Sequence, residues 1–194
     1  MADFVLSSGN TVRPHRSPWG AFPVKGYKLS TGLSSNQIFI GSLVVLDQAS
    51  TAFGDCVIKA SVSSATLNPP AASIVGISAE TPSSAVPGSG INPQSTTPGA
   101  QGSIMVWEAN PNVEFKAWTR GGLITSTIVG TIRELTRDTT LNIDLVRLAG
   151  ASALATPAPC VIVTQIADGF ASGDSGGAVI FRFNTSSGFL AFYR

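Results

Sequence analysis

The stretch Val113-Glu114-Phe115-Lys116-Ala117-Trp118 decides the fold class of this chain, because apolar and polar side chains alternate along it. The same alternation recurs in Ile180-Phe181-Arg182-Phe183, close to the C-terminal end. A period of two residues is typical of a strand that has one face in a core and the other toward solvent. Both segments are therefore predicted to be half-buried strands of antiparallel sheets.

Further short apolar and β-branched runs lie on both sides of these two segments, separated by Gly, Pro, Ser and Asn. The predicted strands are residues 37–47, 56–62, 73–78, 103–108, 113–119, 123–134, 141–148, 160–166, 178–183 and 189–193. Many short strands with such spacing predict an all-β fold, a compact β-barrel or β-sandwich. The best helical candidate, residues 131–140, is rich in Thr, which has poor helix propensity.

The first 28 residues differ from the rest in composition and are predicted to form an extended N-terminal arm, with residues 29–194 as a single β domain. Two prolines within Arg13-Pro14-His15-Arg16-Ser17-Pro18-Trp19-Gly20 exclude a helix interior or a central strand. The arm either packs back onto its own domain or docks onto a partner. The residues expected to contact a partner are Arg13, His15, Arg16, Trp19 and Phe22.

Two further segments, residues 80–101 and 150–159, are loops by composition. The first is long, and loops of that length inside a compact domain are usually functional or disordered. One functional use would be contact with a neighbouring subunit.

The composition bounds the classes of partner. Only 12% of the 194 residues are charged, 43% are hydrophobic, and the formal net charge is +1. Such a chain has no global field to recruit nucleic acid or an anionic membrane, and both partners are disfavoured. A sparsely charged surface instead favours self-association. The start, Met1-Ala2-Asp3-Phe4, lacks the features of a secretion signal, so synthesis in a cytoplasm is expected.

The two cysteines, Cys56 and Cys160, each open an apolar run. Buried free thiols are the favoured interpretation in a reducing compartment, and a disulfide between two neighbouring strands is the alternative. One histidine and two distant cysteines offer no clustered metal ligands, and no cofactor is expected.

The motif Gly173-Asp174-Ser175-Gly176-Gly177 matches the nucleophile motif of chymotrypsin-like serine proteases. A serine hydroxyl needs an imidazole base, which itself needs a carboxylate partner. The one histidine, His15, lies in the proline-rich arm, and the best carboxylate, Asp144, precedes Ser175 by only 31 residues. That spacing leaves no room for a second barrel between them. We therefore expect a tight structural turn and no catalytic residues.

Taken in order, several segments resemble the capsid decoration, or cement, proteins of tailed bacteriophages. These are the start Met1-Ala2-Asp3-Phe4-Val5-Leu6, the run Ile38-Phe39-Ile40-Gly41-Ser42-Leu43-Val44-Val45-Leu46-Asp47, Ile74-Val75-Gly76-Ile77, Ile104-Met105-Val106-Trp107, Asn110-Pro111-Asn112-Val113-Glu114-Phe115-Lys116-Ala117, and the strands predicted at 160–166 and 178–183.

The resemblance implies a structural protein on the outside of an icosahedral virion, assembled in the host cytoplasm. Such a protein forms a homotrimer and bridges subunits of the major capsid protein, and many weak contacts together resist internal pressure. Three alternatives stay open: a tail or spike component, a carbohydrate-binding β module, and a serine hydrolase based on the Ser175 motif alone.

Overall fold

The structure, a computed structural model, describes residues 10–29, 38–46, 56–59, 62–63, 66–67, 74–80, 103–141, 143–148 and 160–184. Within these ranges the regular elements are strands and one 3-10 turn, so the predicted all-β class is confirmed. The elements are β1 (Arg13–Arg16), β2 (Val24–Leu29), β3 (Leu43–Leu46), β4 (Cys56–Lys59), β5 (Val62–Ser63), β6 (Thr66–Leu67), β7 (Ile74–Ser78), β8 (Ser103–Glu108), β9 (Glu114–Arg120), η3 (Ser126–Ile128), β10 (Ile132–Asp138), β11 (Ile143–Arg147), β12 (Cys160–Ile166) and β13 (Ala178–Phe183).

Five strands form a closed barrel in the order β2-β4-β3-β7-β8, which confirms the barrel among the two predicted architectures. The β2–β4 pair is parallel, and the other pairs are antiparallel. Its interior holds a buried apolar cluster. The members of this cluster are Tyr27, Ile38, Val44, Val57, Val75, Ile104 and Val106.

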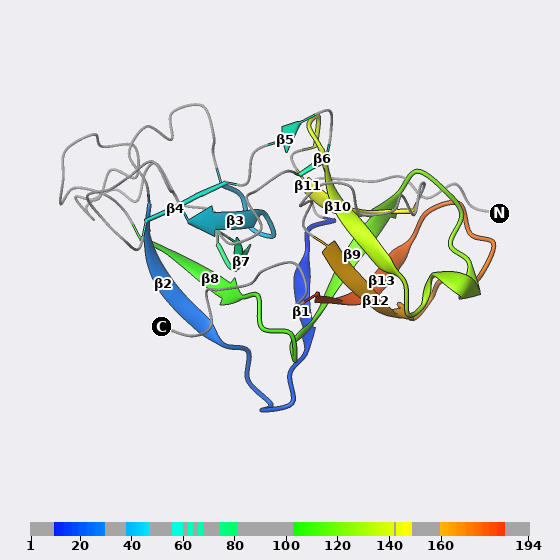
Figure 1. Cartoon of the computed structure of the whole chain (residues 1–194), viewed down its shortest axis with the longest axis horizontal. Coiled ribbons are helices and arrows are strands. Elements are labelled where there is room, and N and C mark those ends of the chain that lie inside the picture. Colours follow the sequence, from blue (N-terminus) through cyan, green and yellow to red (C-terminus); the bar gives the residue numbers. More distant parts are fainter. Residues whose placement is uncertain are drawn as a thin grey trace.

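The remaining strands form a second sheet beside this barrel (Figure 1). Its pairings also close on themselves: β9 pairs with β13, β13 with β12, β12 with β10, β10 with β11, and β11 with β9 in parallel. β1 extends this ring at the free edge of β9, and the β5–β6 pair joins it at β10. The described chain thus has two rings of five strands each.

The largest apolar cluster belongs to both rings, because β3 is buried on both of its faces. Leu43 and Val45 join the cluster that contains Phe115 and Phe181 of the second ring, whereas Val44 lies inside the first. A strand buried on both faces needs a continuous apolar run, which Leu43-Val44-Val45-Leu46 supplies. The packing of β3 therefore holds the two rings together.

Inside the second ring, alternation produces the faces that the sequence predicts. In β9, Phe115, Ala117 and Thr119 are buried, and the residues between them are partly exposed. Phe115 packs against Phe181 and Phe183 of β13, with ring centroids 5.8 and 5.5 Å apart. Such aromatic pairs contribute about 1 kcal/mol beyond the area that they bury. These three aromatic side chains form the centre of the core of the second ring of strands.

Several predicted boundaries agree with the structure and others do not; the strand predicted at 37–47, for example, begins only at Leu43 in the described residues. β8, β12 and β13 have the predicted limits. The helical candidate at 131–140 is wrong: it is mostly β10, whose pairing with β11 and β12 overrides any local preference. The strand predicted at 123–134 begins only at Ile132, after the η3 turn. The predicted strand at 189–193 lies outside the described residues.

The extended arm predicted for residues 1–28 is not confirmed in the part that the structure describes. β2 is a member of the first barrel, and β1 is hydrogen-bonded to β9. Pro14 fits in β1 because this strand lies at a sheet edge, and the register shifts between Pro14 and Arg16. Residues 1–9, 81–101 and 150–159, which include most of the two predicted loops, lie outside the described residues.

The cysteines begin strands of different sheets. Cys56 is aligned with Lys28 of β2 in the first barrel, and Cys160 with Glu134 of β10 in the second ring. The two strands are not hydrogen-bonded neighbours, so the alternative of a disulfide between adjacent strands loses its premise.

Candidate functional site

The glycine-rich motif near β13 forms the tight turn that the sequence predicts. Gly173 and Gly176 have φ of 104° and 96°, values that favour glycine. The backbone carbonyl of Asp174 accepts from the amides of Ile124 (2.9 Å) and Gly176 (3.1 Å), and its carboxylate accepts from the amide of Ala171 (2.8 Å). Asp174 therefore binds the backbone of the turn.

Gly177 ties this turn to the sheet. Its carbonyl accepts hydrogen bonds from the amide (2.8 Å) and the hydroxyl (3.1 Å) of Thr119 in β9. With φ of 153°, a Cβ at this position would lie 2.5 Å from Phe170 Cδ1 and 2.7 Å from Ile124 Cδ1. Only glycine fits there, so packing alone accounts for this glycine of the motif.

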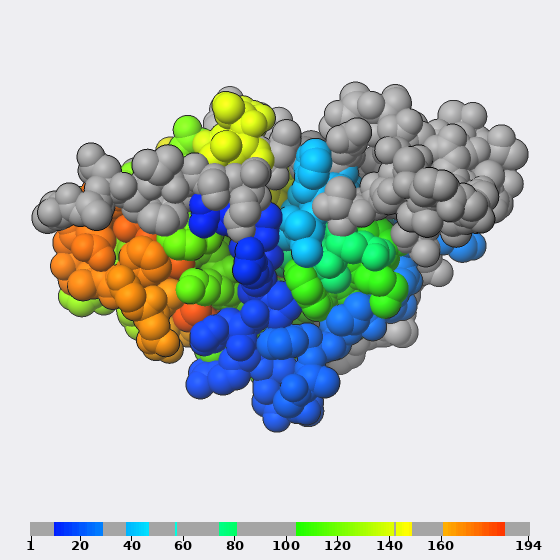
Figure 2. Space-filling view, turned by 180° about the vertical axis from the view of Figure 1, so that it is seen from behind, coloured from blue at the N-terminus to red at the C-terminus, as the bar shows by residue number. Residues whose placement is uncertain are grey.

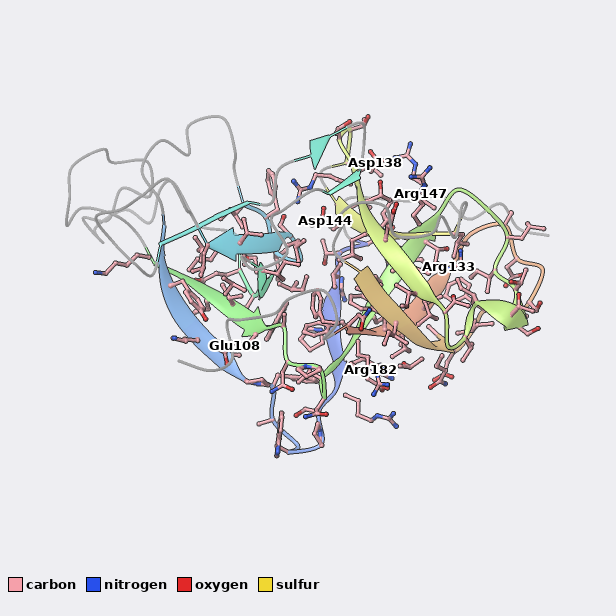
Figure 3. The ribbon with its side chains drawn as sticks, viewed as in Figure 1. Glu108, Arg133, Asp138, Asp144, Arg147 and Arg182 are labelled. Carbon is pink, nitrogen blue, oxygen red and sulfur yellow. The ribbon has the colours of Figure 1, made fainter. Side chains whose placement is uncertain are left out.

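The serine of the motif is exposed, and its hydroxyl makes no hydrogen bond to any residue in the described ranges. The proposed carboxylate, Asp144, is engaged elsewhere. Its side chain is fully buried and accepts from Arg137 through Nε to Oδ1 (2.6 Å) and Nη2 to Oδ2 (3.0 Å). The amide of Leu43 also donates to Oδ2, at 2.6 Å. Figure 3 shows Asp144 where the two rings meet.

The single imidazole lies in a third place. His15 is exposed in β1, beside the Glu114–Phe115 end of β9. The turn that holds Ser175 is bonded to Thr119, near the other end of β9. Four residues of strand separate these two ends by roughly 13 Å. The structure therefore does not bring His15, Asp144 and Ser175 together.

The best candidate for a functional surface is the loop between β1 and β2. The loop begins with a turn in which Ser17 Oγ and its carbonyl accept from the amides of Trp19 (3.3 Å) and Gly20 (3.3 Å). Trp19 is 58% exposed, the largest fraction for a bulky apolar side chain in the described ranges. The loop projects beyond both rings, as the blue segment at the bottom of Figures 1 and 2 shows. We refer to residues 17–23 as the Trp19 loop.

The five residues predicted for partner contact lie on or beside this loop, in different environments. Arg13, His15 and Arg16 are exposed on β1, where Arg16 forms an ion pair with Glu114 (2.8 Å). Phe22 is half-buried and packs against the large apolar cluster, so it anchors the loop. Trp19 is therefore the aromatic ring that the loop presents to solvent.

Sequence reasoning missed two neighbours of these residues. Lys116 is aligned with Arg13 across the β1–β9 pair, and Arg182 lies on the adjacent strand β13. Both occupy outward positions of alternating strands, and this signal was present in the sequence. What was missing was the strand order β1-β9-β13, which places them beside β1.

The described ranges contain neither a cluster of metal ligands nor a membrane-spanning helix. No three His, Cys, Asp or Glu side chains there gather closely enough to hold a metal ion. Among those same residues, no helix has the length and apolar character needed to span a membrane.

Comparison with protein-family models finds no matching family, and no curated protein or solved structure matches the chain significantly.

Proposed function

We propose that this chain is a structural virion protein that binds the outside of an icosahedral capsid and bridges subunits of its major capsid protein. The single observation that carries the proposal is the Trp19 loop, which presents an exposed tryptophan beside two exposed arginines. Trp and Arg are the residue types most enriched among the few that dominate binding energy at protein interfaces. A loop of this kind is suited to insert into a pocket on another protein.

The scaffold behind the loop supports the same proposal. The loop is held at both ends by strands, β1 in the second sheet and β2 in the first barrel, and Phe22, near the β2 end, packs against the large apolar cluster. A recognition element with fixed ends loses little conformational entropy on binding. The cluster shared between the rings connects these two supports, so a load applied at the loop would reach both rings.

The low charge of the chain supports the same proposal. Because only 12% of its residues are charged and its net charge is +1, the protein is better suited to a large assembly than to a free monomeric state. We propose a homotrimer whose three Trp19 loops engage neighbouring capsid subunits at once. Multivalent attachment would strengthen binding by about 10² to 10⁴ over a single loop.

The test uses shells assembled from the major capsid protein encoded in the same genome. Wild-type protein should sediment with the shells and saturate them at a ratio fixed by the lattice, and native mass spectrometry of the free protein should give a trimer. Saturation without a fixed ratio, or no co-sedimentation at all, would contradict the proposal.

A matched pair of variants makes this test specific. Trp19→Ala should weaken shell binding by more than about 2 kcal/mol, the threshold for a dominant interface residue. Leu123→Ala is the control, because Leu123 is 56% exposed but lies in the loop before η3, away from the Trp19 loop. Equal losses for both variants would indicate non-specific adhesion and sink the assignment of the loop.

A further inference from the structure

The dipeptide Asp168-Gly169 joins two residue types whose main chain can rearrange without an enzyme. An aspartate carboxyl group and the amide nitrogen of the next residue can close a five-membered imide ring. Glycine favours this reaction because it has no Cβ to hinder the approach to its nitrogen. Asp168-Gly169 is the only place in the 194 residues where an aspartate or asparagine precedes a glycine.

The structure places this pair in an exposed turn between β12 and β13. The amide of Phe170 donates to the carbonyl of Ala167 at 3.2 Å, so Asp168 and Gly169 are the two central residues of a β-turn. Both are exposed, and Gly169 has φ of +89° with nothing within 4 Å of the position of a Cβ. The connection, orange in Figures 1 and 2, lies on the surface of the second ring, on the side away from the first barrel. The turn therefore leaves open space around the two reacting groups.

Neither reacting group is held by a hydrogen bond within the described ranges. The Asp168 carboxylate and the Gly169 amide have no such bond to any described residue. The other aspartates of the described ranges differ, because main-chain amides bind each of their carboxylates. These are Asp138, bound by Thr140 and Leu141, Asp144, bound by Leu43 and also by Arg137, and Asp174, bound by Ala171. Asp168 is thus the described aspartate whose carboxyl group is free to turn toward the next amide.

We propose that Asp168-Gly169 is a covalent modification site, at which the aspartate isomerises to isoaspartate through an imide. The Gly169 nitrogen attacks Cγ of the protonated Asp168 carboxyl group. The N–Cγ bond forms, the Cγ–OH bond breaks, and the hydroxyl leaves as water with the amide proton. Water then opens the ring: addition at Cγ restores aspartate, whereas addition at the main-chain carbonyl carbon of Asp168 breaks its bond to the Gly169 nitrogen and gives isoaspartate. One water is lost and one is taken up, so no oxidant or other reagent is needed.

The product changes the main chain at a turn that positions an aromatic side chain. In isoaspartate the main chain runs through Cβ and Cγ, which adds one carbon atom between Ala167 and Phe170. Phe170 follows directly, and its ring packs edge-on against Trp118 of β9, with the ring centroids 5.3 Å apart. The same ring closes the space beside Gly177, where a Cβ would lie 2.5 Å from Phe170 Cδ1. Isomerisation therefore lengthens the turn that holds Phe170 in these contacts.

The experiment incubates the folded wild-type protein for several weeks at physiological temperature and mildly acidic pH, and then maps its peptides. Endoproteinase Asp-N cleaves before aspartate but not before isoaspartate, so cleavage before Asp168 should be lost progressively. Mass spectrometry should also detect a minor form of this peptide that is lighter by one water, which is the imide. Cleavage before Asp174 is the internal control and should stay complete, because the Ala171 amide holds its carboxylate. No capsid shell is used, so the outcome does not depend on the proposed function.

Two variants and an unfolded sample make the test specific. Asp168→Glu keeps the carboxylate but would need a six-membered ring, so its peptide should show no loss of water. Gly169→Ala adds a methyl group beside the attacking nitrogen, where the structure has room for it, and should lose Asp-N cleavage more slowly than the wild type. Wild-type protein unfolded in guanidinium chloride gives the reactivity of the free chain. Isoaspartate at Asp168 in that sample but not in the folded protein would show that the fold protects the pair, and would overturn the proposal. Equal loss of cleavage before Asp168 and Asp174 would overturn it as well.

Discussion

The backbone amide of Leu43 in β3 donates a 2.6 Å hydrogen bond to the carboxylate of Asp144 in β11, and this bond joins the two rings of strands. Arg137, directly opposite Asp144 in the β10–β11 register, neutralises the same carboxylate with two further bonds. Both side chains are almost completely buried, at 0% exposure for Asp144 and 4% for Arg137. The junction between the rings thus contains one buried polar network, made by Asp144, Arg137 and the amide of Leu43, within an otherwise apolar contact; we call this network the polar lock.

Breaking this lock on one side should be costly. Asp144→Asn removes the negative charge that Asp144 places against the buried Arg137 guanidinium, and we expect a loss of about 3–5 kcal/mol in the free energy of unfolding. Urea denaturation measures it. Arg147→Gln is the control: its ion pair with Glu134 is long (3.5 Å) and its side chain is 46% exposed, so the change should stay below about 1 kcal/mol. Similar losses in both variants would contradict the special role of Asp144.

The turn before β13 makes a second prediction, based on steric fit. Gly177→Ala should destabilise the fold by more than about 2 kcal/mol, because its Cβ would overlap Phe170 and Ile124 and its φ of 153° is strained for alanine. Gly130→Ala isolates the backbone cost, since Gly130 has φ of +82° but nothing within 4 Å of a Cβ. It should lose only about 1 kcal/mol in thermal or urea unfolding. A smaller loss at Gly177 than at Gly130 would show that the site relaxes.

Short-range patterns were enough to predict β9 and β13, the two strands whose aromatic side chains meet in the core of the second ring. Alternation over Glu114–Arg120 and Ala178–Phe183 reports burial on one face, and that face is where Phe115 and Phe181 meet. β2 was missed because its sequence, Val-Lys-Gly-Tyr-Lys-Leu, has two lysines and a glycine and lacks a clear apolar face. In the structure, Tyr27 is the buried residue among those of β2 whose burial is described. Barrel closure through β8 supplies that strand with partners that the local sequence does not reveal.

The candidate site was predictable only in part, for a related reason. Trp19 and the arginines of β1 stand out locally, as aromatic and charged residues in a proline-rich segment. Lys116 and Arg182 join them only through the strand order β1-β9-β13. Likewise, the sequence suggested Asp144 only as a candidate catalytic carboxylate. Its partners come from elsewhere in the fold: Arg137 from β10, which pairs with β11, and the amide of Leu43 from β3 of the first barrel.

The shared core predicts that the two rings unfold together. Each ring contains one tryptophan reporter, Trp107 in β8 and Trp118 in β9. In each test variant, one of these two tryptophans is kept and the other two tryptophans of the chain are changed to phenylalanine. The urea midpoint of the remaining tryptophan's fluorescence should equal the midpoint obtained by circular dichroism on the same variant. A reporter midpoint that departs from the midpoint of the whole fold would show that one ring unfolds without the other.

The last prediction concerns the serine of the glycine-rich turn, because its motif is the one feature that suggests an enzyme. Asp174 and the glycines of this turn are engaged by backbone hydrogen bonds and packing, while the Ser175 hydroxyl makes no hydrogen bond to any of the described residues. Ser175→Ala should therefore change the free energy of unfolding by less than about 0.5 kcal/mol.

The same serine should also be chemically inert. Activation of a serine requires an imidazole within hydrogen-bonding distance, and His15 lies toward the opposite end of β9 while Asp144 is bound to Arg137. Wild-type protein treated with a fluorophosphonate probe should gain no mass on Ser175 in peptide mass spectrometry, with a known serine protease as the positive control. Labelling that His15→Ala abolishes would mean that the two residues meet in solution, and the chain would then have to be reconsidered as a hydrolase.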